Sequence, residues 1–195
     1  MRENLIHLTS TKSTNEYLHD LISTDDSLSE GLVVWSDYQS AGKGQLDNAW
    51  ESEPGKNLTF SMLFFPSFLP VTDQFLLSQF VSLGIVDYLV NDIGLKDVSI
   101  KWPNDIYFED RKLAGVLIEH ALMGSKINYS IVGIGLNVNQ VNFLLPPNPV
   151  SLKHIIGTDS DLGEIMEMLL TVTQDKMEML QHENNLCREY MNRLY

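Results

Sequence analysis

The chain has 195 residues, of which 44% are hydrophobic and 20% are charged, a composition typical of one globular domain with a substantial core. Thirteen basic residues stand against 26 acidic ones, and the formal net charge of -13 argues against a general surface for nucleic acid or anionic membranes. The single cysteine, Cys187, excludes an internal disulfide and fits a reducing cytoplasm. The first residues lack the basic and long apolar regions of a signal peptide, and no apolar run reaches membrane-spanning length. We therefore expect a cytoplasmic protein that binds neither DNA nor a membrane.

A strand over residues 5–8 and a helix that begins near Asn15 are the first elements that the pattern predicts. Hydroxyl and amide side chains lie between them. The side-chain oxygen of Ser13 or Thr14 would cap the helix by accepting a backbone N–H. Helix capping by itself explains this polar cluster without any ligand.

A β-rich run over residues 31–38 predicts a strand, which leads directly into a glycine-containing loop that begins at Gln39. Gly42 and Gly44, on either side of Lys43, would allow backbone N–H groups to approach a phosphate. The motif is weak by itself, because the stretch has neither the Walker pattern nor the Rossmann spacing. A flexible surface loop remains an open interpretation.

The remaining long elements are apolar enough to build the core. Periodicity predicts strands over residues 57–65 and 127–139, a largely buried helix over 72–91, and a second long helix from Asp161 onward. Gly133 and Gly135 lie inside the later strand, where glycine allows a ligand or a neighbouring backbone to come close. Packing against a neighbouring helix is the alternative explanation of these two glycines, and it needs no ligand.

Residues 101–119 predict two short strands and a longer one, joined by tight turns. Charged and amide side chains fall at the strand ends, namely Lys101, Asn104, Asp105 and Lys112. A lysine in such a place suits a carboxylate or a phosphate, and the oxygens of Asn and Asp suit a turn or a metal. On this spacing alone, a solvated β-hairpin and a ligand site both remain open.

The motifs KWPND at residues 101–105 and RKLAG at residues 111–115 resemble the signature of biotin protein ligases, which adenylate biotin and pass it to a lysine of an acceptor protein. The resemblance implies an α/β (α+β) fold in which helices flank a mixed β-sheet, as in the class II synthetase-like catalytic domain of biotin/lipoate ligases. It covers residues 1–195 as one catalytic domain. We expect neither the N-terminal DNA-binding domain nor the small C-terminal β domain of such ligases in this chain.

The resemblance also implies roles for individual residues. Substrate-binding residues would come from the Ser-Thr-Asn segment, from the glycine loop and its tryptophan, and from two later strands: Ser13, Thr14, Asn15, Gln39, Lys43, Gly44, Gln45, Trp50, Gly115 and Asn137. Nucleotide-binding residues would be Lys101, Asn104 and Lys112. For Trp50, a core or lid aromatic without ligand contact is an equally good interpretation.

The glycine loop departs from the family pattern at three positions. Lys43 stands where the family has its usual first arginine, so the charge remains but the planar fork that binds phosphate in two places is lost. Gln45 replaces a further arginine, and Asp47 replaces a common glycine and brings a negative charge toward the expected phosphate. These differences bear on how tightly an adenylate would be held.

The implied substrates are biotin and ATP, with Mg²⁺ as cofactor. Lys112 is the candidate for the charge that bridges the biotin carboxylate and the α-phosphate. Asp105 is the candidate for binding Mg²⁺ and for helping to deprotonate the acceptor lysine. The implied partner is the biotin carboxyl-carrier domain of a biotin-dependent carboxylase, and a homodimer paired through strands is compatible with the resemblance.

Two other functions stay open. A lipoate-type ligase would share this build, although the Ser-Thr-Asn segment and Gln39 favour a polar ring such as the ureido group over an aliphatic dithiolane. A non-catalytic biotin-binding homologue belongs to a different class of function. The replacements at Lys43, Gln45 and Asp47 support that second alternative.

Overall fold

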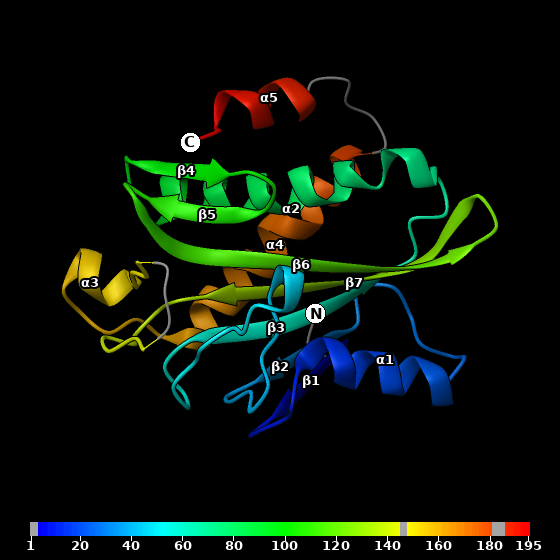
Figure 1. The fold of residues 1–195 in the computed structure, drawn as a ribbon, viewed down its shortest axis with the longest axis horizontal. Helices are drawn as coiled ribbons and strands as arrows, with labels where there is room; N and C mark the ends of the chain where they lie inside the picture. Colours follow the sequence, from blue (N-terminus) through cyan, green and yellow to red (C-terminus); the bar gives the residue numbers. More distant parts are fainter. Residues whose placement is uncertain (1–3, 145–147, 181–185) are drawn as a thin grey trace.

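The computed structural model describes residues 4–144, 148–180 and 186–195 and is built on one seven-stranded mixed β-sheet (Figure 1). The strands are β1 (Leu5–Leu8), β2 (Val33–Ser36), β3 (Leu58–Phe64), β4 (Val98–Lys101), β5 (Asp105–Phe108), β6 (Arg111–Met123) and β7 (Lys126–Leu136). They lie in the order β1-β2-β3-β7-β6-β5-β4. β1 and β2 are parallel, whereas the other neighbouring pairs are antiparallel. The predicted mixed sheet with flanking helices is confirmed.

Helices cover both faces of this sheet (Figure 1). The helices are α1 (Thr14–Thr24), α2 (Phe75–Asp87), α3 (Leu152–Ile156), α4 (Leu162–Leu180) and α5 (Leu186–Asn192), with shorter turns η2 (Gln45–Asp47), η3 (Val71–Asp73) and η4 (Tyr88–Asp92). α1 packs on β2, β3 and β7, whereas α2 packs on β4, β5 and β6 and is itself covered by α4 and α5. None of the described helices is long and apolar enough to cross a membrane.

β3 shows how the two faces of the sheet differ. Successive side chains of a strand point to opposite faces. Phe60 and Met62 belong to the large core that also contains the buried side of α2 and α4. Leu63 belongs to a smaller cluster with Leu18 of α1, and Ser61 hydrogen-bonds to α1 on the same side. On β3, the face toward α2 and α4 is therefore apolar, and the face toward α1 is partly polar.

The starts of the helices follow local chemistry, with one correction. Ser13 occupies the N-cap of α1, but within the described chain its side chain makes no capping bond. The backbone N–H of Thr14 donates instead to Oε1 of Gln39 at 2.7 Å. The expected cap by Ser13 or Thr14 is therefore wrong, because a tertiary contact supplies the acceptor. Asp161 does cap α4, since its Oδ1 accepts from the N–H of Gly163 at 2.8 Å.

Most predicted elements are found with small changes of length. The buried helix predicted over residues 72–91 is α2 followed by the π-helical turn η4, and the helix predicted from Asp161 onward is α4. The strand expected to end at Glu119 continues to Met123. It is longer because β7 pairs with β6 as far as Lys126.

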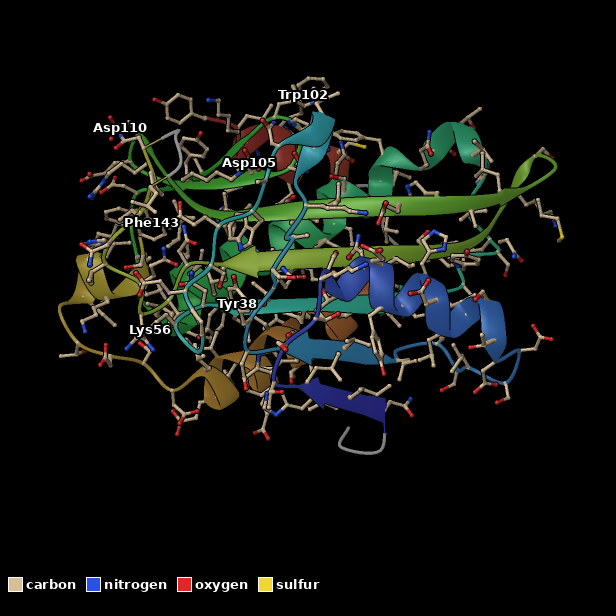
Figure 2. The ribbon with its side chains drawn as sticks, turned by 60° about the horizontal axis from the view of Figure 1, so that its bottom comes forward. Tyr38, Lys56, Trp102, Asp105, Asp110 and Phe143 are labelled. Carbon is tan, nitrogen blue, oxygen red and sulfur yellow. The ribbon has the colours of Figure 1, made fainter. Side chains whose placement is uncertain are left out.

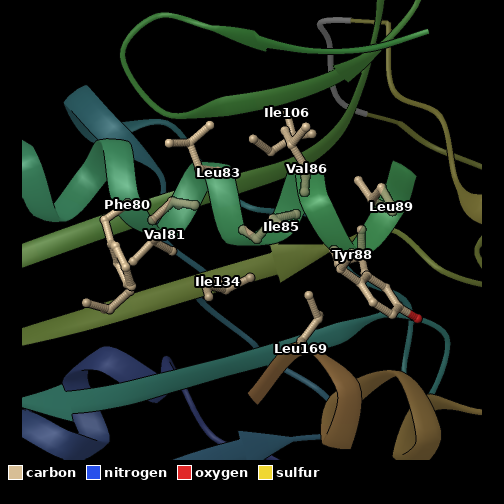
Figure 3. Packing of buried hydrophobic residues seen from close by; sticks show 14 of the residues in the cluster. Phe80, Val81, Leu83, Ile85, Val86, Tyr88, Leu89, Ile106, Ile134 and Leu169 are labelled. Atoms are coloured by element: carbon tan, nitrogen blue, oxygen red, sulfur yellow. The ribbon is translucent and has the colours of Figure 1, made fainter. Parts of the chain in front are cut away.

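The packing of α4 can be tested with two adjacent residues. Leu169 is 0% exposed and lies in the core that Ile85 and Ile134 also fill (Figure 3), whereas Met168 is 42% exposed. Leu169→Ala should lower the free energy of unfolding by about 2–5 kcal/mol, because it leaves a void in the core. Met168→Ala should change it by only about 0.5 kcal/mol. Urea denaturation measures both, and equal losses would contradict this packing.

Candidate functional site

A cavity of about 180 Å³ opens on the α1 side of the sheet. Its walls are the start of α1, the facing strands and the loop over residues 42–50, which Figure 2 shows crossing the strands toward Trp102, with Asp105 beside it. The cavity gathers most of the predicted site residues: Ser13, Thr14, Asn15, Gln39, Lys43, Gly44, Gln45, Trp50, Asn104, Asp105, Lys112 and Gly115. Tertiary structure therefore brings together residues from both halves of the chain.

Three glycines on one face of β6 and β7 make room for the cavity. Gly115 pairs with Gly135 across the two strands, and Gly133 is the next position of β7 on that face. A methyl group on Gly135 would overlap the indole of Trp50, and one on Gly133 would overlap the amide of Asn15. These two positions require glycine because of close approach, and the groups that approach are side chains, Asn15 of α1 and Trp50 of the loop, where the sequence analysis had expected a ligand, a neighbouring backbone or a helix.

A β-bulge decides where Lys112 points. The register between β5 and β6 shifts between Ile106 and Tyr107, which leaves Leu113 as an extra residue in β6. An extra residue changes the alternation of side chains along the strand. Leu113 and Ala114 are neighbours in sequence, yet both are 0% exposed in the core. Lys112 is thereby turned toward the cavity.

Lys112 is held through its side chain and its backbone. Its Nζ forms an ion pair with Oδ1 of Asp105 at 2.8 Å, and the two side chains are 23% and 28% exposed. Nζ also lies 5.6 Å from the centre of the Trp50 ring, within cation–π range. The backbone N–H of Lys112 donates to the carbonyl of Asn148 at 3.0 Å, and its carbonyl accepts from the N–H of Val150 at 2.9 Å. The ammonium therefore has a defined position in the cavity.

A set of linked polar side chains borders the cavity, and three of them, Thr14, Asn15 and Gln39, line it. The N–H of Thr14 donates to Gln39 Oε1, as described above, and the Thr14 hydroxyl lies 3.1 Å from the same oxygen. Ser61 Oγ lies 2.6 Å from both Thr14 Oγ1 and Asn15 Oδ1. Asn15 Nδ2 donates to Glu119 Oε2 at 2.6 Å. We call these five residues the polar wall.

The loop over residues 42–50 is closed by its own backbone. The N–H of Trp50 donates to the carbonyl of Gly42 at 2.9 Å. Nζ of Lys43 lies 3.6 Å from Oε2 of Glu16, which ties the loop to α1. The indole N–H of Trp50 is buried and has no hydrogen-bond partner among the described residues. The loop thus covers the cavity, with the Trp50 ring packed against Gly135.

Two predicted site residues lie elsewhere. Lys101 is outside the cavity lining, and its Nζ donates to the hydroxyl of Tyr107 at 3.3 Å and lies 4.9 Å from the centre of that ring. Asn137 is buried behind the site and donates to the carbonyl of Val150 at 3.1 Å and to that of Lys112 at 3.4 Å. Asn137 therefore supports the backbone that carries Lys112. Direct ligand contact by either residue stays a prediction.

Ser61 and Glu119 belong to the polar wall, although the sequence analysis did not select them. Ser61 sits in the middle of the mostly apolar strand predicted over residues 57–65. A buried hydroxyl needs a hydrogen-bond partner, and this signal could have drawn attention to Ser61. Glu119 stood at the end of a predicted strand, where a carboxylate needs no explanation.

The site fits Mg²⁺ only together with a phosphate-bearing substrate. The described residues contain no group of three His, Cys, Asp or Glu side chains that could hold a metal. Asp105 is a carboxylate in the cavity lining, and Mg²⁺ is commonly bound by one or two carboxylates plus substrate phosphates. The side chain of Asp47, expected near a phosphate, lies outside the described part of the structure.

A second hollow adjoins the cavity and shares Gln45 and Asn104 with it. Ile118 and His120 of β6 line the new part. Burial lowers the pKa of His120 below its ordinary value, so its ring is neutral at pH 7, and its Nδ1 lies 2.8 Å from the hydroxyl of Ser130. Phe75 and Ser78 of α2 also line this hollow, so it lies toward α2, whereas the first cavity lies on the α1 side of the sheet.

Comparison with known proteins identifies the family. The profile of the biotin/lipoate A/B protein ligase family matches residues 7–137, which include the polar wall, the loop and the Lys112–Asp105 pair. The chain belongs to this family. The resemblance found in the sequence is confirmed.

Individual ligases show how far the similarity extends. The bifunctional ligase/repressor BirA of Bacillus subtilis is 31% identical over 174 residues, 87% of this chain and 52% of BirA. Biotin–[acetyl-CoA-carboxylase] ligase of Mycobacterium tuberculosis is 27% identical over 167 residues, 84% of this chain and 61% of the ligase. The chain thus spans only about half the length of BirA.

The fold of the family agrees with the structure described above. Biotin protein ligase from Aquifex aeolicus, solved in complex with biotin and ATP, has a TM-score of 0.82 and 29% sequence identity with this chain. The match covers 98% of this chain and 78% of the Aquifex ligase.

The close contact between Gly135 and Trp50 leads to a prediction. Gly135→Ala should displace the indole and lower the free energy of unfolding by about 1–3 kcal/mol, as overpacking does. Gly84→Ala in α2 is the control, because its new methyl group would meet Thr173 at an ordinary 3.8 Å. Chemical denaturation and tryptophan emission, to which Trp50 contributes beside Trp35 and Trp102, report both effects. Unchanged stability and emission in Gly135→Ala would contradict the proposed contact.

Proposed function

We propose that this chain is an ATP-dependent biotin protein ligase that forms biotinyl-5′-AMP and transfers biotin to a lysine of a carboxylase carrier domain. One observation carries the proposal: in a chain of this family, one cavity is lined both by the Thr14, Asn15 and Gln39 part of the polar wall and by the Lys112–Asp105 ion pair. The polar wall suits the ring of biotin. The ion pair suits the place where a carboxylate and a phosphate must meet.

The polar wall favours biotin over lipoate. The ureido ring of biotin carries N–H donors and a carbonyl acceptor, whereas the dithiolane ring of lipoate carries neither. Covering buried polar groups with an apolar ring would leave them unpaired, at about 1–3 kcal/mol for each group. A lipoate-type ligase nevertheless remains the alternative within the same family.

In the proposed first step, a carboxylate oxygen of biotin attacks the α-phosphorus of ATP, and pyrophosphate leaves. Two unit charges about 4 Å apart repel by roughly 4 kcal/mol at an effective dielectric constant of about 20. A lysine ammonium has three N–H donors. Asp105 accepts from the Lys112 ammonium at 2.8 Å, so the remaining donors are available to the carboxylate and the α-phosphate. Lys112 would align and neutralise both reactants without forming a covalent bond.

The product of this step is a mixed anhydride that must be kept from water. The loop over residues 42–50 would act as the lid, with the Trp50 ring against Gly135 and the charge of Lys43 at its edge. A lysine contacts phosphate as a point charge, whereas the arginine of related ligases can bind it in two places. We therefore propose that this chain releases its adenylate faster than an arginine-bearing ligase does.

In the proposed second step, the amine of an acceptor lysine attacks the acyl carbon, and the bond to the AMP oxygen breaks. The attacking amine has to lose a proton, and Asp105 is the proposed group that accepts it. Mg²⁺ carried by the ATP phosphates would neutralise part of their charge in the first step, with Asp105 as its protein ligand. A carboxyl-carrier domain as partner, a homodimer and a cytoplasmic location remain predictions.

Lys112 provides the most direct test of the proposal. Lys112→Ala should lower the rate of biotin-dependent pyrophosphate release by about 100- to 1,000-fold, because it removes the charge placed between the reacting anions. The variant should remain folded by circular dichroism. Near-normal turnover would contradict the proposed role of Lys112 between the two reacting anions.

Lys153→Ala is the matched control for charge. Lys153 forms an ion pair with Asp159 at 2.7 Å and lies in α3, apart from the described residues that line the cavity. Its loss changes the net charge by the same amount as Lys112→Ala. Turnover by Lys153→Ala should stay within about twofold of the original chain, since surface ion pairs contribute little.

Ligand-dependent melting tests the choice of substrate. A ligand at 100 times its Kd stabilises the folded state by about 2.7 kcal/mol, which raises the Tm of a domain of this size by roughly 5–10 °C. Biotin with ATP should raise the Tm more than either compound alone, and lipoate should not replace biotin. A shift with lipoate alone would favour the lipoate-type alternative. A shift with biotin but no pyrophosphate release would identify a non-catalytic homologue.

A further inference from the structure

The polar wall contains a chain of hydrogen bonds whose direction can be worked out. It runs from Gln39 through the Thr14 hydroxyl and the Ser61 hydroxyl to the amide of Asn15, and it ends at Glu119. Thr14, Asn15 and Ser61 are at least 97% buried, with exposed fractions of 3%, 3% and 0%. Bulk water therefore cannot supply missing protons to the inner contacts.

Glu119 determines the orientation of the Asn15 amide. A carboxylate only accepts hydrogen bonds, so the Asn15 atom at 2.6 Å from Glu119 Oε2 must be the donor Nδ2. The same nitrogen lies 3.5 Å from the carbonyl of Leu117, which is also an acceptor. The other amide atom, Oδ1, must therefore face Ser61, where it can only accept.

Counting protons then fixes the rest of the chain. There are three oxygen–oxygen contacts: Gln39–Thr14 at 3.1 Å, Thr14–Ser61 at 2.6 Å and Ser61–Asn15 at 2.6 Å. Each hydroxyl brings one proton, whereas the amide oxygens bring none, so two protons serve three contacts. Ser61 must donate to Asn15 Oδ1, because that oxygen can only accept. The single Thr14 proton could serve Ser61 at 2.6 Å or Gln39 at 3.1 Å, and we assign it to the shorter contact, with Ser61. The longest contact, between Gln39 and Thr14, is left without a proton.

This leaves two acceptor oxygens side by side in the cavity wall. Gln39 Oε1 is held in place because it accepts from the backbone N–H of Thr14 at 2.7 Å. Thr14 Oγ1 has lone pairs to offer but no proton. Both residues line the cavity. A ligand N–H placed between the two oxygens would satisfy both, whereas a ring oxygen or sulfur there would add a third acceptor.

We infer that Glu119, which is outside the cavity lining, sets the hydrogen-bond direction of the polar wall and so makes the site select an N–H group of the ligand ring. Glu119 is a positioning residue that acts through Asn15 and Ser61. The inference rests on the proposed function for the identity of the ring, a cyclic urea. The direction of the chain itself is a property of the unliganded protein.

Glu119→Gln tests the inference without a change of side-chain size. The new amide can accept from or donate to Asn15, so only the long 3.5 Å contact with the carbonyl of Leu117 still opposes turning Nδ2 toward Ser61. Ser61 would then donate to Thr14, and Thr14 to Gln39, which fills all three contacts and removes the unpaired acceptors. Asp20→Asn is the control, because it removes one negative charge from an exposed position of α1.

The probes are biotin and two cyclic carbamates, in each of which one ureido N–H is replaced by a ring oxygen. In the original chain, the carbamate whose ring oxygen falls between Gln39 Oε1 and Thr14 Oγ1 should bind at least about 100-fold more weakly than biotin. A site built for an N–H group rejects an analogue that lacks it. Glu119→Gln should weaken biotin about 10-fold and reduce this discrimination to about 10-fold or less. Asp20→Asn should change neither quantity. If Glu119→Gln leaves both within twofold of the original chain, the inference is overturned.

Ser61→Ala decides the case if Glu119→Gln does not fold. Without the Ser61 hydroxyl, Thr14 is free to donate to Gln39 Oε1. This fills the acceptor pair by another route, so biotin should again bind about 10-fold more weakly and the discrimination should fall. Full discrimination in a folded Ser61→Ala would overturn the inference.

A measurement on the unliganded protein separates this inference from the proposed function. In ¹⁵N-labelled protein, the Asn15 side-chain amide proton near Glu119 should resonate downfield, because its bond to a carboxylate is short. Glu119→Gln should move it upfield, and Asp20→Asn should not. If this pattern appears but biotin does not bind, the ligase proposal fails and the hydrogen-bond direction stands. If Glu119→Gln leaves the resonance unmoved, the direction itself is wrong.

Discussion

The site depends on the difference between the two faces of one sheet. On one face, side chains such as Phe60 and Ile134 form the core with α2 and α4, and this burial supplies most of the hydrophobic stabilisation. On the other face, Gly115, Gly133 and Gly135 have no side chains, so side chains from other elements can lie directly on the backbone of β6 and β7. Because the first face already holds the sheet together, the second can be hollowed without loss of the core.

The side chains that surround the cavity come from outside β6 and β7, the two strands that form its base. Asn15 enters from α1 over Gly133, and Trp50 enters from the loop over Gly135. Each side chain occupies space that an ordinary β-carbon would take. The cavity is therefore preorganised: its polar wall and its aromatic cover are already in contact with the sheet before a ligand arrives.

The position of the Lys112 charge in the cavity depends on backbone geometry as much as on the type of side chain. Lys112 reaches the cavity because Leu113 is an extra residue in its strand, and Asp105 meets it from the neighbouring strand. A regular β5–β6 pairing would have put the ammonium on the opposite face. The KWPND and RKLAG motifs pointed to the right residues, but nothing in their spacing shows the bulge.

The sequence alone determined the elements, the mixed sheet and the family, because periodicity and a dense local motif are properties of short stretches of chain. It also selected most of the residues that line the cavity, yet it assigned Ser13 and Thr14 a capping role that Gln39 performs, and it passed over Ser61 and Glu119. Only the tertiary structure decided these points. Hydrogen bonds between residues that are 46 or 104 positions apart depend on strand order and register, which no local pattern encodes.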